Sequence, residues 1–266
     1  MRKPFLIIIW SIAAVCAVVG IIIHVYPGKG ISSGGRSIDA DSFNAGGQYE
    51  KTGAFSSLDI DCGTAVITVG QGAEYAVEIT ARNPSKANRM PVWAVEGSTL
   101  KVYQKDDNFI SLGPLNDTTY YVNVSVPGTD DEMLDKINID SGTGTVSLNG
   151  INTDQLIIDT GTGSVNISDC RVNELEIDSG TGSLSVDLIS AAKKIDIDNG
   201  TGSIALTLPG TEDDYNVDID NGLGSVTIGD EKVRGEYKSK GSGEGAIKID
   251  NGTGSINIAF TGNISE

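Results

Sequence analysis

The tripeptide Asp-Ser-Gly or Asp-Thr-Gly, which is the sequence signature of aspartic proteases, occurs at Asp140, Asp159 and Asp178. An aspartic protease holds two such loops on opposite sides of a cleft, where the two carboxyl groups share a proton. Here the tripeptide recurs at a nearly constant interval and becomes Asp-Asn-Gly in later copies. This regular recurrence indicates a repeated turn, so we predict no protease and no other catalytic residue.

The repeated aspartates could also bind a cation. The aspartates of the clear copies are Asp140, Asp159, Asp178, Asp198, Asp220 and Asp250. On stacked strands such carboxylates would lie about 4.8 Å apart, and unpaired they would repel one another. Either each carboxylate accepts hydrogen bonds from the N–H groups of its own Gly-x-Gly turn, or calcium bridges the column through oxygen ligands. We expect the turn-capping role, keep the calcium column as the alternative, and predict no cofactor.

The composition excludes several classes of function. The 266 residues include 19 basic and 36 acidic side chains, a net charge of −17, and one histidine, His24. That histidine lies in an apolar N-terminal run, so the rest of the chain lacks the residue needed for Ser-His-Asp catalysis or His-ligated zinc. The acidic surface disfavours binding to nucleic-acid phosphates. Cys62 and Cys170 have no metal-binding spacing, and we expect no disulfide between them.

The aspartates belong to a repeat with a period of about 20 residues. Its clear copies are INIDSGTGTVSL (137–148), LIIDTGTGSVNI (156–167), LEIDSGTGSLSV (175–186), IDIDNGTGSIAL (195–206), VDIDNGLGSVTI (217–228) and IKIDNGTGSINI (247–258), with a degenerate copy, LDIDCGTAVITV (58–69). Apolar and polar residues alternate on both sides of a Gly-x-Gly corner, which predicts two half-buried strands around a turn. The residue before each aspartate should point inward, giving the column Ile139, Ile158, Ile177, Ile197, Ile219 and Ile249.

Near-identical units at a near-constant period predict an all-β fold, a single-stranded β-solenoid (β-helix) of about 20-residue coils. Stacked hairpins in a meander or barrel are the alternative. The interval grows between the last copies, which predicts insertions that bulge at one corner, the longest being 230–246. Between the first copy and residue 137 the motif is lost, but strand patterns persist at 75–81, 92–95, 100–103 and 120–126. These strands predict irregular coils with a long loop near 105–116.

Polar residues occupy the outward positions of the repeat. They include Asn138, Ser147, Asn166, Glu176, Ser185, Asp196, Thr227 and Asn257. A flat polar face of this kind either binds a glycan or a protein, or is an ordinary solvated sheet surface. Aromatic residues, which provide stacking platforms for sugars, are scarce among these positions.

The N-terminus has the features of a membrane anchor. Residues 5–26 carry no formal charge and as a helix would extend about 33 Å, enough to cross a bilayer. The apolar run is too long for a cleaved signal peptide and no cleavage site follows it. We therefore predict a cytoplasmic head (1–4), a transmembrane signal anchor (5–26), a flexible linker (27–54) and an extracytoplasmic β-solenoid domain (55–266) on a single-pass protein of the cell membrane.

Three stretches resemble a known bacterial family. They are YYVNVSVPG (120–128), the serial IxIDxGTGSVxI units, and the closing GEGAIKIDNGTGSINI (243–258). Over roughly residues 55–260 the chain is similar to the membrane-anchored "putative adhesin" family, a domain of unknown function whose relatives occur beside Lia-type envelope-stress regulators. The resemblance implies a β-solenoid and carries over no catalytic residues.

Together these observations predict a non-enzymatic interaction or adhesion module of the cell envelope, accessory to an envelope-stress response. The expected partners are the membrane and an envelope protein or glycan, and no nucleic acid. One alternative is a β-helix enzyme acting on polysaccharide, which would need paired carboxylates in a groove or a basic residue at the reacting carbon. A second alternative is a metal-stabilised structural spacer.

Overall fold

The computed structural model describes part of the chain in detail. The described residues are 48–82, 90–104, 119–128 and 133–262. All of them belong to the second of two units into which the chain divides, Gly34–Glu266. The predicted head (1–4), the anchor (5–26) and the loop near 105–116 lie outside the described residues. Within the described part, no helix has the length and apolar character needed to cross a membrane.

Seventeen strands form one mixed sheet in the described residues. They are β1 (Gln48–Lys51), β2 (Ser57–Gly72), β3 (Ala76–Arg82), β4 (Pro91–Glu96), β5 (Thr99–Gln104), β6 (Thr119–Pro127), β7 (Leu134–Asn149), β8 (Asn152–Thr181), β9 (Leu184–Leu188), β10 (Lys194–Thr201), β11 (Ile204–Leu208), β12 (Tyr215–Leu223), β13 (Val226–Ile228), β14 (Glu231–Val233), β15 (Tyr237–Lys240), β16 (Gly245–Thr253) and β17 (Ile256–Phe260). A 3₁₀ turn, η3 (Glu212–Asp214), precedes β12.

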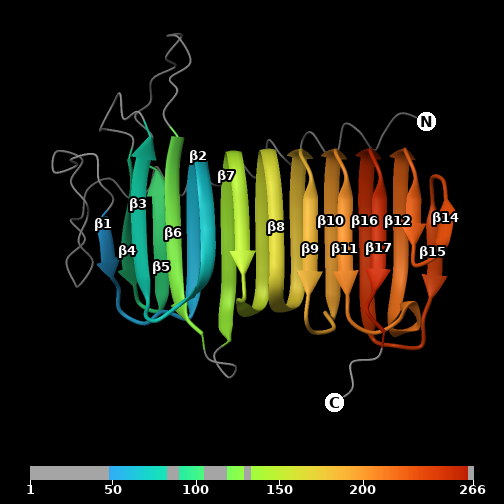
Figure 1. The fold of residues 1–266 in the computed structure, drawn as a ribbon, viewed down its shortest axis with the longest axis horizontal. Helices are drawn as coiled ribbons and strands as arrows, with labels where there is room; N and C mark the ends of the chain where they lie inside the picture. The colour runs from blue at the N-terminus through green and yellow to red at the C-terminus, as the bar shows by residue number, and fades with distance from the viewer. Residues whose placement is uncertain (1–47, 83–89, 105–118, 129–132, 263–266) are drawn as a thin grey trace, which may run out of the picture. The chain divides into compact units, whose positions relative to one another are not determined.

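The repeats stack in parallel and in register. Ile139 on β7 pairs with Ile158 on β8, and Ile197 on β10 pairs with Ile177 on β8. Equivalent residues therefore lie side by side in successive repeats, as the row of upright strands in Figure 1 shows. The prediction of an all-β, solenoid-like fold is confirmed. The sheet is mixed, however, because antiparallel strands are added at both ends of the parallel stack.

Each repeat consists of two arms, a first arm before the Gly-x-Gly corner and a second arm after it. Along both arms buried and exposed residues alternate, as in β9 and β11. The predicted inward column is confirmed: Ile139, Ile158, Ile177, Ile197, Ile219 and Ile249 are each at most 1% exposed. Apolar side chains from both arms pack into one continuous core. The thiols of Cys62 and Cys170 are free and buried in it.

Close approach between neighbouring corners explains the second glycine of the motif. Gly163 has φ of +156°, and a Cβ placed there would lie 1.6 Å from the carbonyl oxygen of Gly144 in the preceding repeat. A residue with a side chain cannot occupy this position without moving the backbone of its neighbour. The glycine therefore sets how closely one corner packs on the next.

The last two repeats exchange places relative to the sequence. β16 pairs in parallel with β10 on one side and with β12 on the other, and β17 pairs with both β11 and β13. The final repeat in the sequence thus lies between the two repeats that precede it. Stacking order therefore differs from sequence order here, which is possible because near-identical residues give every repeat the same pairing register.

The segment expected to bulge at a corner forms strands instead. β14 pairs antiparallel with β13, and β15 pairs antiparallel with β12. If residues 230–246 formed a loop at the corner, the outermost repeat would leave a row of unpaired backbone groups at the sheet edge. The short strands β14 and β15 cover that edge.

The N-terminal strands are also arranged differently from the irregular coils that we expected. The strands themselves are confirmed, as β3 to β6. The first repeat, β2, pairs directly with β7, while β5 and β6 lie on its other side, parallel to it. β4 pairs antiparallel with β5, β3 with β6 and β1 with β3. Intervening strands therefore cap the first repeat, just as β14 and β15 cap the other end.

Candidate interaction faces

The repeated aspartates form one column on the outside of the first arms. Asp140 pairs with Asp61 and with Asp159, and Asp198 pairs with Asp178 and with Asp250. Asp220 follows beside Asp250 at the end of the column. The predicted column is therefore present, with its last two members in exchanged order.

Close packing of these carboxyl groups changes their acidity. The pKa of Asp140 is raised to about 6, mainly by partial burial and then by the negative charges of Asp61, Asp159 and Asp59. Burial and the charges of neighbouring carboxylates likewise raise the pKa of Asp178 to about 6. Burial also raises the pKa of Asp159 and of Asp198. When these carboxyl groups are ionised above pH 6, their partial burial and mutual repulsion therefore lower the stability of the folded state.

The turn-capping role expected for these aspartates is wrong. Among the described residues, no hydrogen bond ends on a carboxylate oxygen of Asp140, Asp159, Asp178, Asp198, Asp220 or Asp250. In an alternating strand the aspartate follows an inward isoleucine and must point outward, away from the turn's N–H groups.

The next residue points inward and makes the corner's polar contacts. The amide of Asn199 donates to Asn251 Oδ1 at 2.7 Å, and the amide of Asn251 donates to Asn221 Oδ1 at 2.8 Å. Asn221 then donates to the carbonyl of Gly254 at 3.2 Å. In earlier repeats Thr160 donates to Ser179 at 3.2 Å. These buried side chains form a ladder that links the repeats, a role that the sequence pattern did not reveal.

The calcium alternative stays a prediction. No group of three or more His, Cys, Asp or Glu side chains within the described residues is arranged to hold a metal ion. The column presents its carboxylates side by side on one sheet surface. A calcium-dependent rise in Tm that disappears in Asp178→Asn would identify a bridging cation.

Lowering the pH should stabilise the protein. An aspartate whose pKa is about 6 in the folded chain and 3.8 in the unfolded chain binds its proton more tightly when folded. Ionisation of this carboxyl group therefore destabilises the folded state. The destabilisation is complete above pH 6 and is lost as the pH falls towards 4. After allowance for solvent screening, we expect about 1 kcal/mol, a rise in Tm of roughly 2–4 °C between pH 7 and pH 5. Asp178→Asn should raise Tm at pH 7 and flatten this dependence, whereas Asp187→Asn, on a second arm, should not. A Tm of the full-length chain that falls as the pH is lowered from 7 to 5 would contradict the account.

The outward polar residues predicted as one face lie on two. Asn138, Glu176 and Asp196 belong to first arms, beside the aspartate column. We call this surface the carboxylate face. Three of its lysines are paired: Lys194 and Lys248 contact Asp196 at 3.1 and 3.5 Å, and Lys238 contacts Asp218.

The remaining predicted residues lie on the second arms, in one row across the sheet. In spatial order the row is Asn123, Thr68, Ser147, Asn166, Ser185, Ala205, Asn257 and Thr227. A flanking row holds Tyr121, Val66, Thr145, Ser164, Ser183, Ser203, Ser255 and Ser225. The other flanking row holds Ser125, Gly70, Asn149 and Ser168, is interrupted by a register shift between Ile167 and Cys170 that includes the exposed Asp169, and continues with Asp187, Thr207 and Ala259. We call these three rows the neutral face, because Asp169 and Asp187 are the only charged residues along them.

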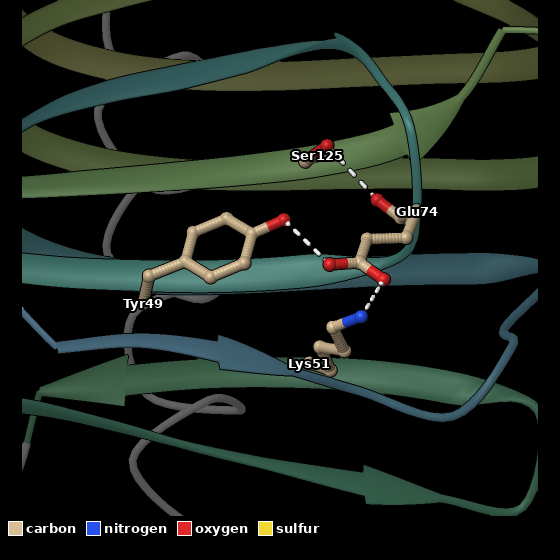
Figure 2. Close-up of polar contacts among 4 residues, drawn as sticks. All are labelled: Tyr49, Lys51, Glu74 and Ser125. Carbon is tan, nitrogen blue, oxygen red and sulfur yellow. Dashed lines mark hydrogen bonds and ion pairs between the residues drawn. The ribbon is translucent and has the colours of Figure 1, made fainter.

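The neutral face continues onto β3 and β1, where it ends in a fixed polar cluster. Tyr49 pairs with Glu78, which pairs with Asn123. Figure 2 shows the Tyr49 hydroxyl donating to Glu74 Oε1 at 3.2 Å and Lys51 Nζ contacting Glu74 Oε2 at 2.5 Å. Ser125 Oγ donates to the carbonyl oxygen of Glu74 at 2.9 Å. These contacts tie strand β1 to the turn between β2 and β3.

Two tyrosines therefore lie on this face, although aromatic residues were expected to be scarce there. Tyr49 is 55% exposed, and Tyr121 is partly exposed two strands away. For Tyr121 a signal was present, since Tyr121, Asn123 and Ser125 alternate with buried residues in β6. Tyr49 lies outside any repeat, and nothing in the sequence places it beside this face.

Comparisons with known proteins agree with this architecture. The chain is similar to a crystallised "putative cell adhesion protein" from Clostridium sporogenes, with 18% identity over 81% of this chain and 99% of that one and a TM-score of 0.52. Matches also include "putative adhesins" from Bacteroides fragilis (12% identity, 80% and 95% covered, TM-score 0.32) and Parabacteroides merdae (14%, 82% and 93%, TM-score 0.25). At these identities the first comparison shows the fold alone. No curated protein matches the sequence.

A family model matches more than half of the chain. The matched residues are 55–207, which run from the strand that begins the first repeat to the second arm of the fourth clear repeat. This range contains the stretch 120–128 and most of the repeats on which the resemblance rests. The chain belongs to the toastrack DUF4097 family.

Proposed function

We propose that this protein is a non-enzymatic adhesion module of the cell envelope that binds an uncharged polymer through its neutral face. The observation that carries the proposal is the separation of charge between the two faces. In a chain with net charge −17, the outward residues of the second arms are almost entirely Ser, Thr, Asn and small residues. The similarity in fold to a crystallised "putative cell adhesion protein" supports an adhesive role.

The arrangement of the neutral face suits an extended ligand. Neighbouring strands are about 4.8 Å apart, so the row from Asn123 to Thr227 extends roughly 34 Å across the sheet. Hydroxyl and amide groups offer both donors and acceptors along this length. An anionic polymer would be repelled by the carboxylate face and would find few free cations on the neutral face.

The carboxylates do not favour the alternative of a polysaccharide-acting enzyme. Glycosidases place two carboxyl groups on either side of the bond that is cleaved. In the part of the chain that the structure describes, the aspartates of the column lie next to one another on one surface, and no second row of carboxyl groups faces them. We therefore assign the column no catalytic role.

We further propose that residues 5–26 anchor the protein in the cell membrane with the sheet domain outside. The uncharged run and the basic residues Arg2 and Lys3 before it support this topology. Protease added to cells stripped of their wall should then degrade a C-terminal tag. A tag that stays protected in otherwise intact cells would contradict the topology.

The adhesive role is tested by placing charge on each face in turn. Asn166→Lys and Asn257→Lys introduce a long cationic side chain at exposed positions of the neutral face, and each should lower binding of the full-length chain to cell-wall fragments at least tenfold. The matched control is Asn138→Lys on the carboxylate face, which should leave binding unchanged. Absence of binding by the unaltered chain, or equal loss in all three variants, would overturn the proposal.

A further inference from the structure

The N-terminal end of the neutral face has the chemistry of a sugar-binding site. Two tyrosines, Tyr49 on β1 and Tyr121 on β6, lie on its outer surface with β3 between their strands. Between them the register places Glu78 and Asn123, whose side chains are hydrogen-bonded to each other at 3.2 Å. Aromatic rings next to amide and carboxylate groups are the combination that binds the apolar face and the hydroxyl groups of a sugar.

We propose that this cluster, Tyr49, Glu78, Tyr121 and Asn123, binds an uncharged linear glycan, with the two tyrosine rings as stacking platforms. This inference rests on the proposed function and names the ligand class of the same face. Asn123 and Glu78 supply the hydrogen bonds to sugar hydroxyls between the rings. The glycan then continues along the Ser, Thr and Asn rows of the repeats.

Spacing of the tyrosines suits consecutive sugar units. Tyr49 and Tyr121 are two strands apart, and Tyr121 pairs with Thr80, two residues along β3 from Glu78. With strands about 4.8 Å apart and a rise of about 3.4 Å per residue, the two positions are roughly 12 Å apart. This separation is comparable with the length of a disaccharide, so both rings can contact one chain.

The ring of Tyr49 is held in place before any ligand arrives. Its hydroxyl donates to Glu74 Oε1, and the other carboxylate oxygen of Glu74 is occupied by Lys51, as Figure 2 shows. The ring nevertheless remains 55% exposed. A fixed, exposed ring loses little conformational entropy when a ligand stacks on it, which favours binding.

Charge around the cluster selects for an uncharged ligand. Glu74 neutralises Lys51, and Glu78 remains with only a neutral amide as its partner. An anionic sugar would therefore meet the carboxylate of Glu78 between the two rings, and Arg82, the basic residue of β3, lies four residues further along that strand. The nearest repeats add only Val66, Thr68 and other uncharged residues.

The experiment measures binding of cellotetraose and chitotetraose, two neutral linear tetrasaccharides, to the full-length protein by isothermal titration calorimetry. We expect saturable binding of at least one of them. Tyr49→Ala and Tyr121→Ala should each weaken it at least tenfold, whereas Tyr49→Phe and Tyr121→Phe should stay within threefold because stacking is kept. Tyr103→Ala is the matched control, since Tyr103 is an exposed tyrosine beside Asp61 on the carboxylate face.

Two results would overturn the inference: no saturable binding of either tetrasaccharide by the folded protein, or equal affinity in the alanine variants. Binding of anionic tetragalacturonate as tight as that of the neutral sugars would overturn the assignment to uncharged glycans. The two proposals also fail separately. If the alanine variants still bind cell-wall fragments normally while Asn166→Lys does not, the tyrosine site is wrong and the neutral face remains the binding surface.

Discussion

Replacing Ile177 with aspartate should cost several kcal/mol of unfolding free energy, because the new carboxylate would have no partner in the apolar core. Ile177 is 1% exposed and belongs to the inward column shared by six repeats. Glu176, one residue away, is exposed on the carboxylate face. Glu176→Lys should therefore change stability by less than about 0.5 kcal/mol. Denaturant unfolding of the purified full-length chain measures both values, and equal losses would contradict the assigned faces.

Alanine in place of Gly163 should be nearly as damaging, although it adds one methyl group. The added Cβ would lie 1.6 Å from the carbonyl oxygen of Gly144, and the backbone there has φ of +156°. The neighbouring repeat must then move away, which breaks contacts along both arms, and we expect a loss of at least about 3 kcal/mol. The matched control is Gly53→Ala, where a Cβ would meet nothing within 4 Å. Comparable melting temperatures for the two variants would show that the corners do not pack as described.

The repeat pattern was sufficient to predict the inner surface of the fold. Alternation around the corner places Ile139 and Ile158 inward, and the structure has both in register in the core. The strands between the first repeat and residue 137 were also identified from alternation. These predictions succeed because burial of one strand face is a local property with a period of two residues.

The order of the repeats could not be predicted in the same way. Every copy offers the same residues for pairing, so Ile197 pairs as well with Ile249 as it would with Ile219. Choice between neighbours depends on how the strands after residue 230 cover the end of the stack, which is a property of the whole sheet. The short strands at both ends cover the long edges of the parallel stack, which is one way in which natural sheets limit exposed edges.

The candidate site was predicted only in part. Ser147, Asn166 and Asn257 were identified as outward and polar, and they do lie on one face. Their separation from Glu176 and Asp196 depends on the corner, which sends the two arms of a repeat to different surfaces. Tyr49 reaches the neutral face through the pairing of β1 with β3, a contact between segments without any repeat motif.

Footprinting of the full-length protein bound to cell-wall fragments tests the central claim most directly. Side chains that contact the ligand lose reactivity towards hydroxyl radicals, so the two faces can be read in one experiment. We predict protection of peptides that contain Tyr121 and of the second-arm residues around Ser185 and Asn257, with first-arm peptides around Glu176 and Lys248 unchanged. Protection confined to the first-arm peptides would show that the carboxylate face is the binding surface and would contradict the account.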